Sequence, residues 1–415
     1  MTRFQWFEVA GVELEYMLVD AKTLDICPVV DSLFKRLTGE ITSDVERGDL
    51  TWSNELAAHV LELKTTRPEA DLEKLPGMFL QEVQSLQATL DSMNLRLLPT
   101  AMHPWMDVRR ESRLWQHENR EIYQAFHRIF DCHTHGWANV QSVHLNLPFA
   151  DEDQFRRLHA AVRIVLPLLP ALAASSPIFD GRAGKDLDSR LVHYRGHCDR
   201  VPSFMGRVIP EPVFSSAEYR QRIFEPIRED IAPLDTDQVM EVEFLNARGA
   251  IARFDRGSIE IRLMDVQESP LVDVAICAMV TGVIKLLVKE TWTSVEEQCQ
   301  VSADLLRTTL DQTIRHAENT ELSDSDFLRH LGIGSNQLRA RDCWESLFQQ
   351  VRAAGVLHSD FDGTIRFLLH HGTLAHRIRD SLGNPRPGQA IPRDALREVY
   401  IRLADCLLGG VHFQP

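Results

Sequence analysis

The chain has 415 residues, with 45 Lys and Arg against 60 Asp and Glu, which gives a formal net charge of −15. Hydrophobic residues make up 44 % of the sequence and charged residues 25 %, a composition that excludes disordered and fibrous proteins. The acidic balance argues against nucleic acid as a partner, because phosphate binding needs a basic face.

Neither a targeting segment nor a membrane span is predicted. The first eight residues lack the apolar core of a signal peptide. The most apolar stretch, 271–288, contains Asp273 and Lys285, so it predicts a buried helix. The seven cysteines are scattered and form no C-x-x-C pair. Such cysteine usage predicts a cytoplasmic protein without disulfides. Because no membrane span is predicted, a membrane partner is not expected.

Two periodicities alternate along the chain. Period-two patterns predict strands at residues 10–20, 60–66, 140–147 and 258–264. Apolar residues every three or four positions predict helices at 77–94, 113–130, 153–173 and 270–292, and further helices from 300 to a last one at 392–408. Between them, residues 180–212 show few regular signals, and a loop of that length is usually functional.

The four predicted strands share an unusual polar face. Side chains two positions apart leave a strand on the same side. That side carries Glu13, Glu15, Glu62, His144, Asn146, Glu260 and Arg262. A half-exposed antiparallel sheet explains one such strand well. It explains all four less well, because solvated faces usually mix Thr, Ser and Lys with the acids.

Grouped carboxylates repel one another unless a cation lies among them. Divalent cations such as Mg²⁺ prefer oxygen ligands and commonly bridge to a substrate phosphate. We therefore predict that this face holds a metal–nucleotide complex, with the arginine close to a transferring phosphoryl group.

Several segments, in order along the chain, resemble the glutamate–cysteine ligase type 2 (carboxylate–amine ligase) family. The resemblance extends from about residue 8 to 290. It rests on residues 11–20 (GVELEYMLVD), Glu55 with 60–68 (VLELKTTRP), 142–146 (SVHLN), 171–181 (ALAASSPIFDG), 188–191 (DSRL) and 257–265 (GSIEIRLMD).

The resemblance implies an α+β fold of the glutamine-synthetase type, a curved and mostly antiparallel β-sheet whose concave face bears the ligands and whose back is covered by helices. We expect a catalytic domain over residues 1–295 and a helical C-terminal portion over 296–415 that packs on it. The implied reaction is ATP-dependent amide-bond formation through an acyl phosphate, with glutamate and cysteine as the expected pair. A homo-oligomer is expected from the family alone.

The same resemblance assigns roles to residues. ATP with Mg²⁺ or Mn²⁺ is the implied cofactor set, and the implied metal ligands are Glu13, Glu15, Glu55, Glu62, His144 and Glu260. Arg262 and Glu260 are the implied catalytic residues. Arg262 and Arg248 are assigned to the nucleotide. Arg190 is the candidate for the substrate carboxylate, and Tyr194 is a candidate lining residue of the substrate cleft.

The sequence departs from the family pattern at three places. His144 stands alone where many members have two histidines in this strand. Residues 246–249 read Asn-Ala-Arg-Gly instead of Asp-x-Arg-Pro, which puts substrate contacts from this turn in doubt. Glu55 and Glu62 are seven residues apart, so one straight strand would place them on opposite faces. We expect a turn or bulge near 57–58, or Glu55 in a different element.

Other residue groups have simpler interpretations. Cys132, His133, His135 and His127 do not have the spacing of a structural zinc site and are interpreted as loop or helix-end residues.

Two other functions stay open: the same chemistry with another amine, and a weakly active relative that acts as a binding or scaffold protein. A metal-dependent phosphotransferase on a related fold would share the first half-reaction.

Overall fold

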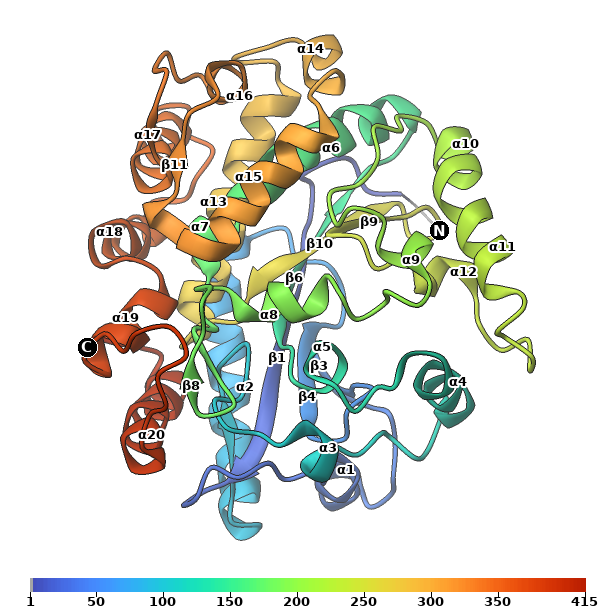
Figure 1. The fold of residues 1–415 in the computed structure, drawn as a ribbon, viewed down its shortest axis with the longest axis vertical. Coiled ribbons are helices and arrows are strands. Elements are labelled where there is room, and N and C mark those ends of the chain that lie inside the picture. The colour runs from blue at the N-terminus through green and yellow to red at the C-terminus, as the bar shows by residue number, and fades with distance from the viewer. Residues whose placement is uncertain (1–2) are drawn as a thin grey trace.

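An open antiparallel sheet of eight strands forms the centre of the protein, in a computed structural model that describes residues 3–415 (Figure 1). The strand order is β2-β3-β4-β1-β6-β10-β9, and β5 also pairs with β1. The strands are β1 (Gly11–Asp20), β2 (Asp44–Arg47), β3 (Leu50–Asn54), β4 (Val60–Thr65), β5 (Leu95–Leu98), β6 (Ser142–Pro148), β9 (Ala250–Arg253) and β10 (Ser258–Asp265). Two small sheets pair β7 (Ile178–Phe179) with β8 (Arg182–Ala183), and β11 (Glu321–Leu322) with β12 (Leu338–Arg339).

Helices surround this sheet, and those that follow β10 lie along one side of the molecule (Figure 1). Up to β9 they are α1 (Val30–Thr38), α2 (Leu75–Ser92), α3 (Val108–Glu111), α4 (Arg120–Phe130), α5 (His135–Ala138), α6 (Glu152–Val165), α7 (Pro170–Ala173), α8 (Ser189–Tyr194), α9 (Pro202–Met205), α10 (Ser216–Tyr219), α11 (Glu225–Ile231) and α12 (Val242–Leu245). After β10 come α13 (Pro270–Val288), α14 (Val295–Cys299), α15 (Ala303–His316), α16 (Ser325–Arg329), α17 (Ala340–Ala353), α18 (Asp362–His371), α19 (Leu374–Ser381) and α20 (Arg393–Gly409).

The apolar face of the sheet packs against α2 and α13. Val12, Leu14 and Tyr16 alternate on β1 and are fully buried in one core with the apolar residues of these two helices. α13 is long and apolar enough to cross a membrane, but 89 % of its most apolar window is buried inside the protein. It is therefore a core helix, as predicted.

The opposite face of β1 changes from polar to apolar along the strand. Glu13 and Glu15 come first, and the next two residues of the same period, Met17 and Val19, are fully buried. These two residues share a second apolar cluster with α19 and α20. The polar part of the face is thus confined to the N-terminal half of the strand, where the site lies.

The predicted α+β class and the four predicted strands are confirmed, with bounds that shift by two residues or fewer. The prediction of a helix over 113–130 is wrong in its first part: α4 begins only at Arg120, after Asn119 in the left-handed region (φ 63°). All seven cysteines are free, as predicted. The boundary at residue 295 stays a prediction.

Candidate active site

Strand register brings the polar residues of four separate strands together. β1 pairs with β4 so that Glu15 faces Glu62, and with β6 so that Glu13 faces His144. β10 pairs with β6 so that Glu260 faces Asn146. Because directly opposed residues lie about 5 Å apart, the polar faces of the four strands form one continuous patch.

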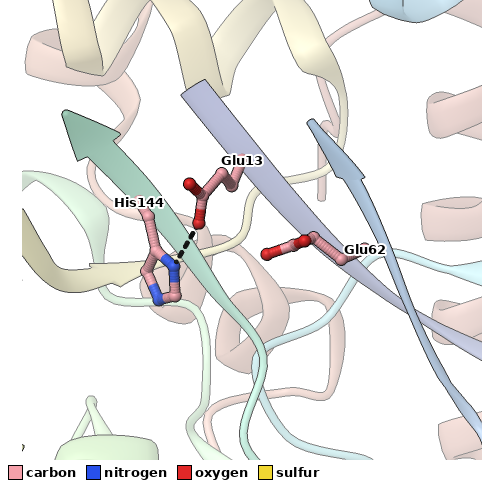
Figure 2. A group of neighbouring side chains, drawn as sticks. All are labelled: Glu13, Glu62 and His144. Carbon is pink, nitrogen blue, oxygen red and sulfur yellow. Dashed lines mark hydrogen bonds and ion pairs between the residues drawn. The ribbon is translucent and has the colours of Figure 1, made fainter. Parts of the chain in front are cut away.

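Glu13, Glu62 and His144 form the centre of this patch and point toward one another (Figure 2). One ligand atom from each of the three side chains lies within 4.8 Å of the others. Nδ1 of His144 lies 2.9 Å from Oε2 of Glu13. Glu62 and His144 are buried and Glu13 is half-buried, so water screens their charges weakly.

The charges of this cluster are mutually dependent. Burial alone would raise the pKa of Glu13, but the hydrogen bond and the charge of His144 outweigh it and lower the pKa to about 2. Burial, together with the charges of Glu13 and Glu55, raises the pKa of Glu62 well above its ordinary value. A divalent cation among these groups would remove that repulsion. The donor set, carboxylate oxygens plus one imidazole, fits Mg²⁺ or Mn²⁺.

Glu15 and Glu55 lie beside this centre. Glu15 accepts hydrogen bonds from the Ser142 amide (2.7 Å) and hydroxyl (3.1 Å), and its other oxygen is 3.8 Å from Nε2 of His144. Glu55 follows the end of β3, and a turn separates it from β4, so the expected break between Glu55 and Glu62 is confirmed. Burial and the Glu15 charge raise the pKa of Glu55 to about 7.

We expect metal binding to weaken as the pH falls through about 7. Because the pKa of Glu55 is raised in the folded protein, a proton on Glu55 stabilises the metal-free fold. This stabilisation is complete below pH 4.5 and is lost as the pH rises through about 7. A metal must displace that proton. The increase in melting temperature caused by Mn²⁺ should therefore be larger at pH 8 than at pH 6.

The matched control for this prediction is Glu118→Gln, which removes an exposed carboxyl outside the cluster and should keep the same pH dependence. An equal Mn²⁺-induced shift at both pH values would contradict the role given to Glu55.

Glu260 lies between two arginines. Its Oε1 is 3.0 Å from Nε of Arg262, and its Oε2 accepts a hydrogen bond of 3.2 Å from Nε of Arg253. Burial would raise the pKa of Glu260, but the charges of Arg262 and His144 outweigh it and keep the pKa below its ordinary value. Glu260 is thus ionised at neutral pH and holds Arg262 beside the cluster.

A cavity of about 210 Å³ opens beside Glu15 and Glu55. Its lining includes four of the predicted site residues besides these two: His144, Arg190, Tyr194 and Arg262. The structure thus brings most of the predicted residues to one place. Glu13, Glu62 and Glu260 adjoin this place through the strand register.

Arg190 reaches the cavity from α8, but a buried acid holds it. Its Nε donates to Oδ1 of Asp265, and its two terminal nitrogens lie 3.4–3.5 Å from the carbonyl oxygen of Arg262. Both Arg190 and Asp265 are at most 2 % exposed. Asp265 also accepts hydrogen bonds from Ser175 and Ser176, so the pair fixes α8 against β10.

Arg248 does not reach the acidic cluster. Its guanidinium donates to both carboxylate oxygens of Glu211 (2.6 and 2.7 Å) and to the carbonyl of Ser203 (3.1 Å). It lies outside the cavity lining, whereas its neighbours Asn246 and Ala247 belong to it. These contacts hold the turn around Arg248 in place, and they do not support the predicted nucleotide contact.

The cavity wall requires a glycine at position 136. A Cβ there would lie 2.6 Å from the His193 carbonyl oxygen and 2.7 Å from Cβ of His197, both fixed parts of the α8 region. We expect Gly136→Ala to destabilise the fold by about 1–3 kcal/mol and to displace α8. The free energy of unfolding in urea measures this effect.

Gly77→Ala is the matched control for Gly136→Ala. No atom lies within 4 Å of a Cβ at Gly77, which is inside α2. This substitution should stabilise the protein by about 0.5–1 kcal/mol. Equal effects of the two substitutions would contradict the close approach of α5 to α8.

The structure adds residues that the sequence interpretation missed. Lys64 lies 2.7 Å from Glu62 and faces Glu13 across the β1–β4 pair. The alternation of Glu62 and Lys64 on one strand could have indicated it. Arg253 could not have been found, because β9 carries a weak strand pattern and was not predicted.

Comparisons with known proteins agree with this site. A family model described as glutamate–cysteine ligase family 2 matches residues 9–352. An uncharacterized protein of Archaeoglobus fulgidus is 34 % identical over 68 % of this chain and 75 % of its own length. A protein of Streptomyces coelicolor, provisionally named glutamate–cysteine ligase 2, is 26 % identical over 90 % of this chain and 93 % of its own.

Solved structures show the same fold at low identity. The crystal structure of glutamate–cysteine ligase from Francisella tularensis in complex with AMP aligns with a TM-score of 0.62 and 14 % identity over 98 % of this chain and 90 % of that one. A bifunctional glutathione synthetase from Pasteurella multocida aligns with a TM-score of 0.60 and 14 % identity, over 96 % and 53 %. With the family model covering most of its length, this chain belongs to glutamate–cysteine ligase family 2, a family of ATP-dependent ligases.

Proposed function

We propose that this protein joins the γ-carboxylate of glutamate to an amine, with ATP as the phosphoryl donor and an acyl phosphate as the intermediate. The observation that carries the proposal is the largely buried cluster of Glu13, Glu62 and His144 beside Arg262 and a cavity. The names of the relatives make cysteine the first amine to test, as in formation of γ-glutamylcysteine. We place the enzyme in the cytoplasm, in line with its free cysteines.

The first half-reaction transfers a phosphoryl group. A carboxylate oxygen of glutamate forms a bond to the γ-phosphorus of ATP, and the bond to the bridging oxygen breaks, so ADP leaves with the electron pair. Both reactants are anions, so neutralisation of charge and positioning matter more than proton transfer. The carboxylate is already ionised at neutral pH and requires no base.

The six proposed metal ligands suit this task. Glu13, Glu15, Glu55, Glu62, His144 and Glu260 would hold Mg²⁺ or Mn²⁺. The ions would neutralise the phosphate oxygens. Arg262 would stabilise the charge that develops on the transferred group, and its Nε forms an ion pair of 3.0 Å with Glu260. Arg190 and Tyr194, in the cavity lining, are the proposed contacts of the amino-acid substrate.

The second half-reaction forms the amide bond. The amine nitrogen forms a bond to the acyl carbon, the carbon–oxygen bond to phosphate breaks, and inorganic phosphate leaves with the electron pair. An alkylammonium must lose two protons overall, one before the attack and one after it. Enclosure of this step protects the acyl phosphate from hydrolysis.

The test uses hydroxylamine, a small nucleophile that captures acyl phosphates as hydroxamates. With ATP, Mg²⁺ and glutamate, the protein should release phosphate and form γ-glutamyl hydroxamate in equal amounts. ATP hydrolysis without hydroxamate would favour a phosphotransferase, and binding of ATP without turnover would favour a scaffold protein. Either result would overturn the proposal.

A further inference from the structure

The cavity beside the acidic cluster has a mixed lining. Glu15 and Glu55 are its carboxylates. The rest of its lining is rich in apolar and aromatic side chains: Leu56, Val60, Phe126, Trp137, Val140, Phe204, Phe244 and Leu245. A binding site that combines a few charged groups with apolar walls selects ligands of matching polarity.

Several of these lining side chains are not fully buried. Leu56, Phe126, Trp137 and Val140 are only half-buried, and Phe244 is 56 % exposed. Trp137 is held in place, since its ring packs at 53° against Phe126 with a centroid distance of 5.4 Å and its indole nitrogen donates to the His197 carbonyl (3.1 Å). When an apolar ligand covers apolar rings that are fixed at a cavity surface, the free energy of binding becomes more favourable.

The cavity offers few cations for a ligand carboxylate. Among the described residues that line it, the permanent cations are Arg190 and Arg262. Arg262 is paired with Glu260 and Arg190 with Asp265. Burial lowers the pKa of His197 to about 4, so this ring is neutral at pH 7. With Arg262 assigned to the phosphates and Arg190 to glutamate, the lining holds neither an arginine nor a lysine for a second carboxylate.

From this polarity we infer that the amine substrate carries an apolar body of aromatic size and no carboxylate group. This inference rests on the proposed function and specifies its second substrate. The amine nitrogen lies next to the acyl carbon, and the apolar body covers Trp137, Phe126 and Phe244. Burial of an aromatic ring favours binding, and burial of a carboxylate without a partner opposes binding more strongly.

The experiment compares amines that differ in one feature. 2-Phenylethylamine and L-phenylalanine differ only in the carboxylate, and 2-phenylethylamine and methylamine differ only in the apolar body. With glutamate, ATP and Mg²⁺ at saturation, kcat/KM for 2-phenylethylamine should exceed both others by about ten-fold or more. L-Cysteine is assayed in parallel.

Two variants test whether the aromatic side chains of the cavity cause the preference for 2-phenylethylamine. Phe244→Ala, and independently Trp137→Ala, should lower the ratio of kcat/KM for 2-phenylethylamine over methylamine by about ten-fold. Phe4→Ala is the matched control, because Phe4 is 40 % exposed and lies outside the cavity lining. This control should leave the ratio unchanged. Because Phe244 is exposed, Phe244→Ala should fold normally. This variant therefore keeps the test valid if Trp137→Ala fails to fold.

The hydroxylamine assay separates the two proposals. Hydroxamate formation together with a higher kcat/KM for L-cysteine or L-phenylalanine than for 2-phenylethylamine would overturn the inference and leave the ligase function in place. Absence of hydroxamate would overturn the proposed function itself, and the inference with it.

Discussion

Replacing Glu260 with glutamine is expected to lower kcat by about 10³-fold or more while the protein stays folded. Glutamine keeps the shape of the side chain but removes the charge that faces Arg262 at 3.0 Å and Arg253 at 3.2 Å. Arg262 would lose its orientation, and the cluster would lose one proposed metal ligand. The measurement is steady-state phosphate release at saturating ATP, glutamate and Mg²⁺.

The control for this prediction is Glu321→Gln, a change in an exposed carboxyl on β11, which should leave kcat unchanged. A far-UV circular dichroism spectrum and a melting curve establish that the Glu260 variant is folded. A kcat close to that of the wild type at saturating Mg²⁺ would show that Glu260 neither holds a metal nor orients Arg262.

The largest effect on stability is expected at Arg377, where α19 meets the segment after β10. Its guanidinium pairs with Glu268, and both side chains are completely buried. Arg377 also donates to the Phe413 carbonyl (2.6 Å), and the Phe413 amide donates to Glu268 (3.1 Å), so the pair anchors the chain near its C-terminal end. Arg377→Ala leaves a buried carboxylate without its partner and should cost about 3–5 kcal/mol of unfolding free energy.

The double variant Glu268→Gln with Arg377→Met should recover much of this loss, because no uncompensated charge then stays buried. Arg397→Ala is the surface control: its partner Asp394 is 92 % exposed, and exposed pairs contribute at most about 1 kcal/mol. A loss below 1 kcal/mol for Arg377→Ala would mean that the C-terminal helices are held mainly by other contacts.

The strands that carry the chemistry could be predicted from the sequence because their pattern is strong. Glu13 and Glu15 alternate with buried Val12 and Leu14, and this period places the acids on one face whatever the neighbouring strands are. The order of strands β4-β1-β6-β10 follows from neither period nor composition. It is set by contacts between residues far apart in the chain, such as the pairing of Glu13 with His144.

The parts that could not be predicted depend on tertiary packing. β9 is short, and only its pairing with β10 brings Arg253 to Glu260. Arg190 was identified from its motif, but its partner Asp265 lies 75 residues further along the chain. The apolar cavity wall comes from four helices, the β3–β4 turn, the start of β4 and the segment before β6, none of which has a pattern that indicates a cavity.

The measurement that tests the central claim most directly follows oxygen from glutamate into phosphate. Glutamate labelled with ¹⁸O in its γ-carboxylate is incubated with ATP, Mg²⁺ and hydroxylamine, and the released phosphate is analysed by mass spectrometry. If the carboxylate attacks the γ-phosphorus and the acyl carbon–oxygen bond then breaks, each phosphate released must carry one ¹⁸O atom. Release of phosphate without the label would show that no acyl phosphate forms, and would contradict this account of the site.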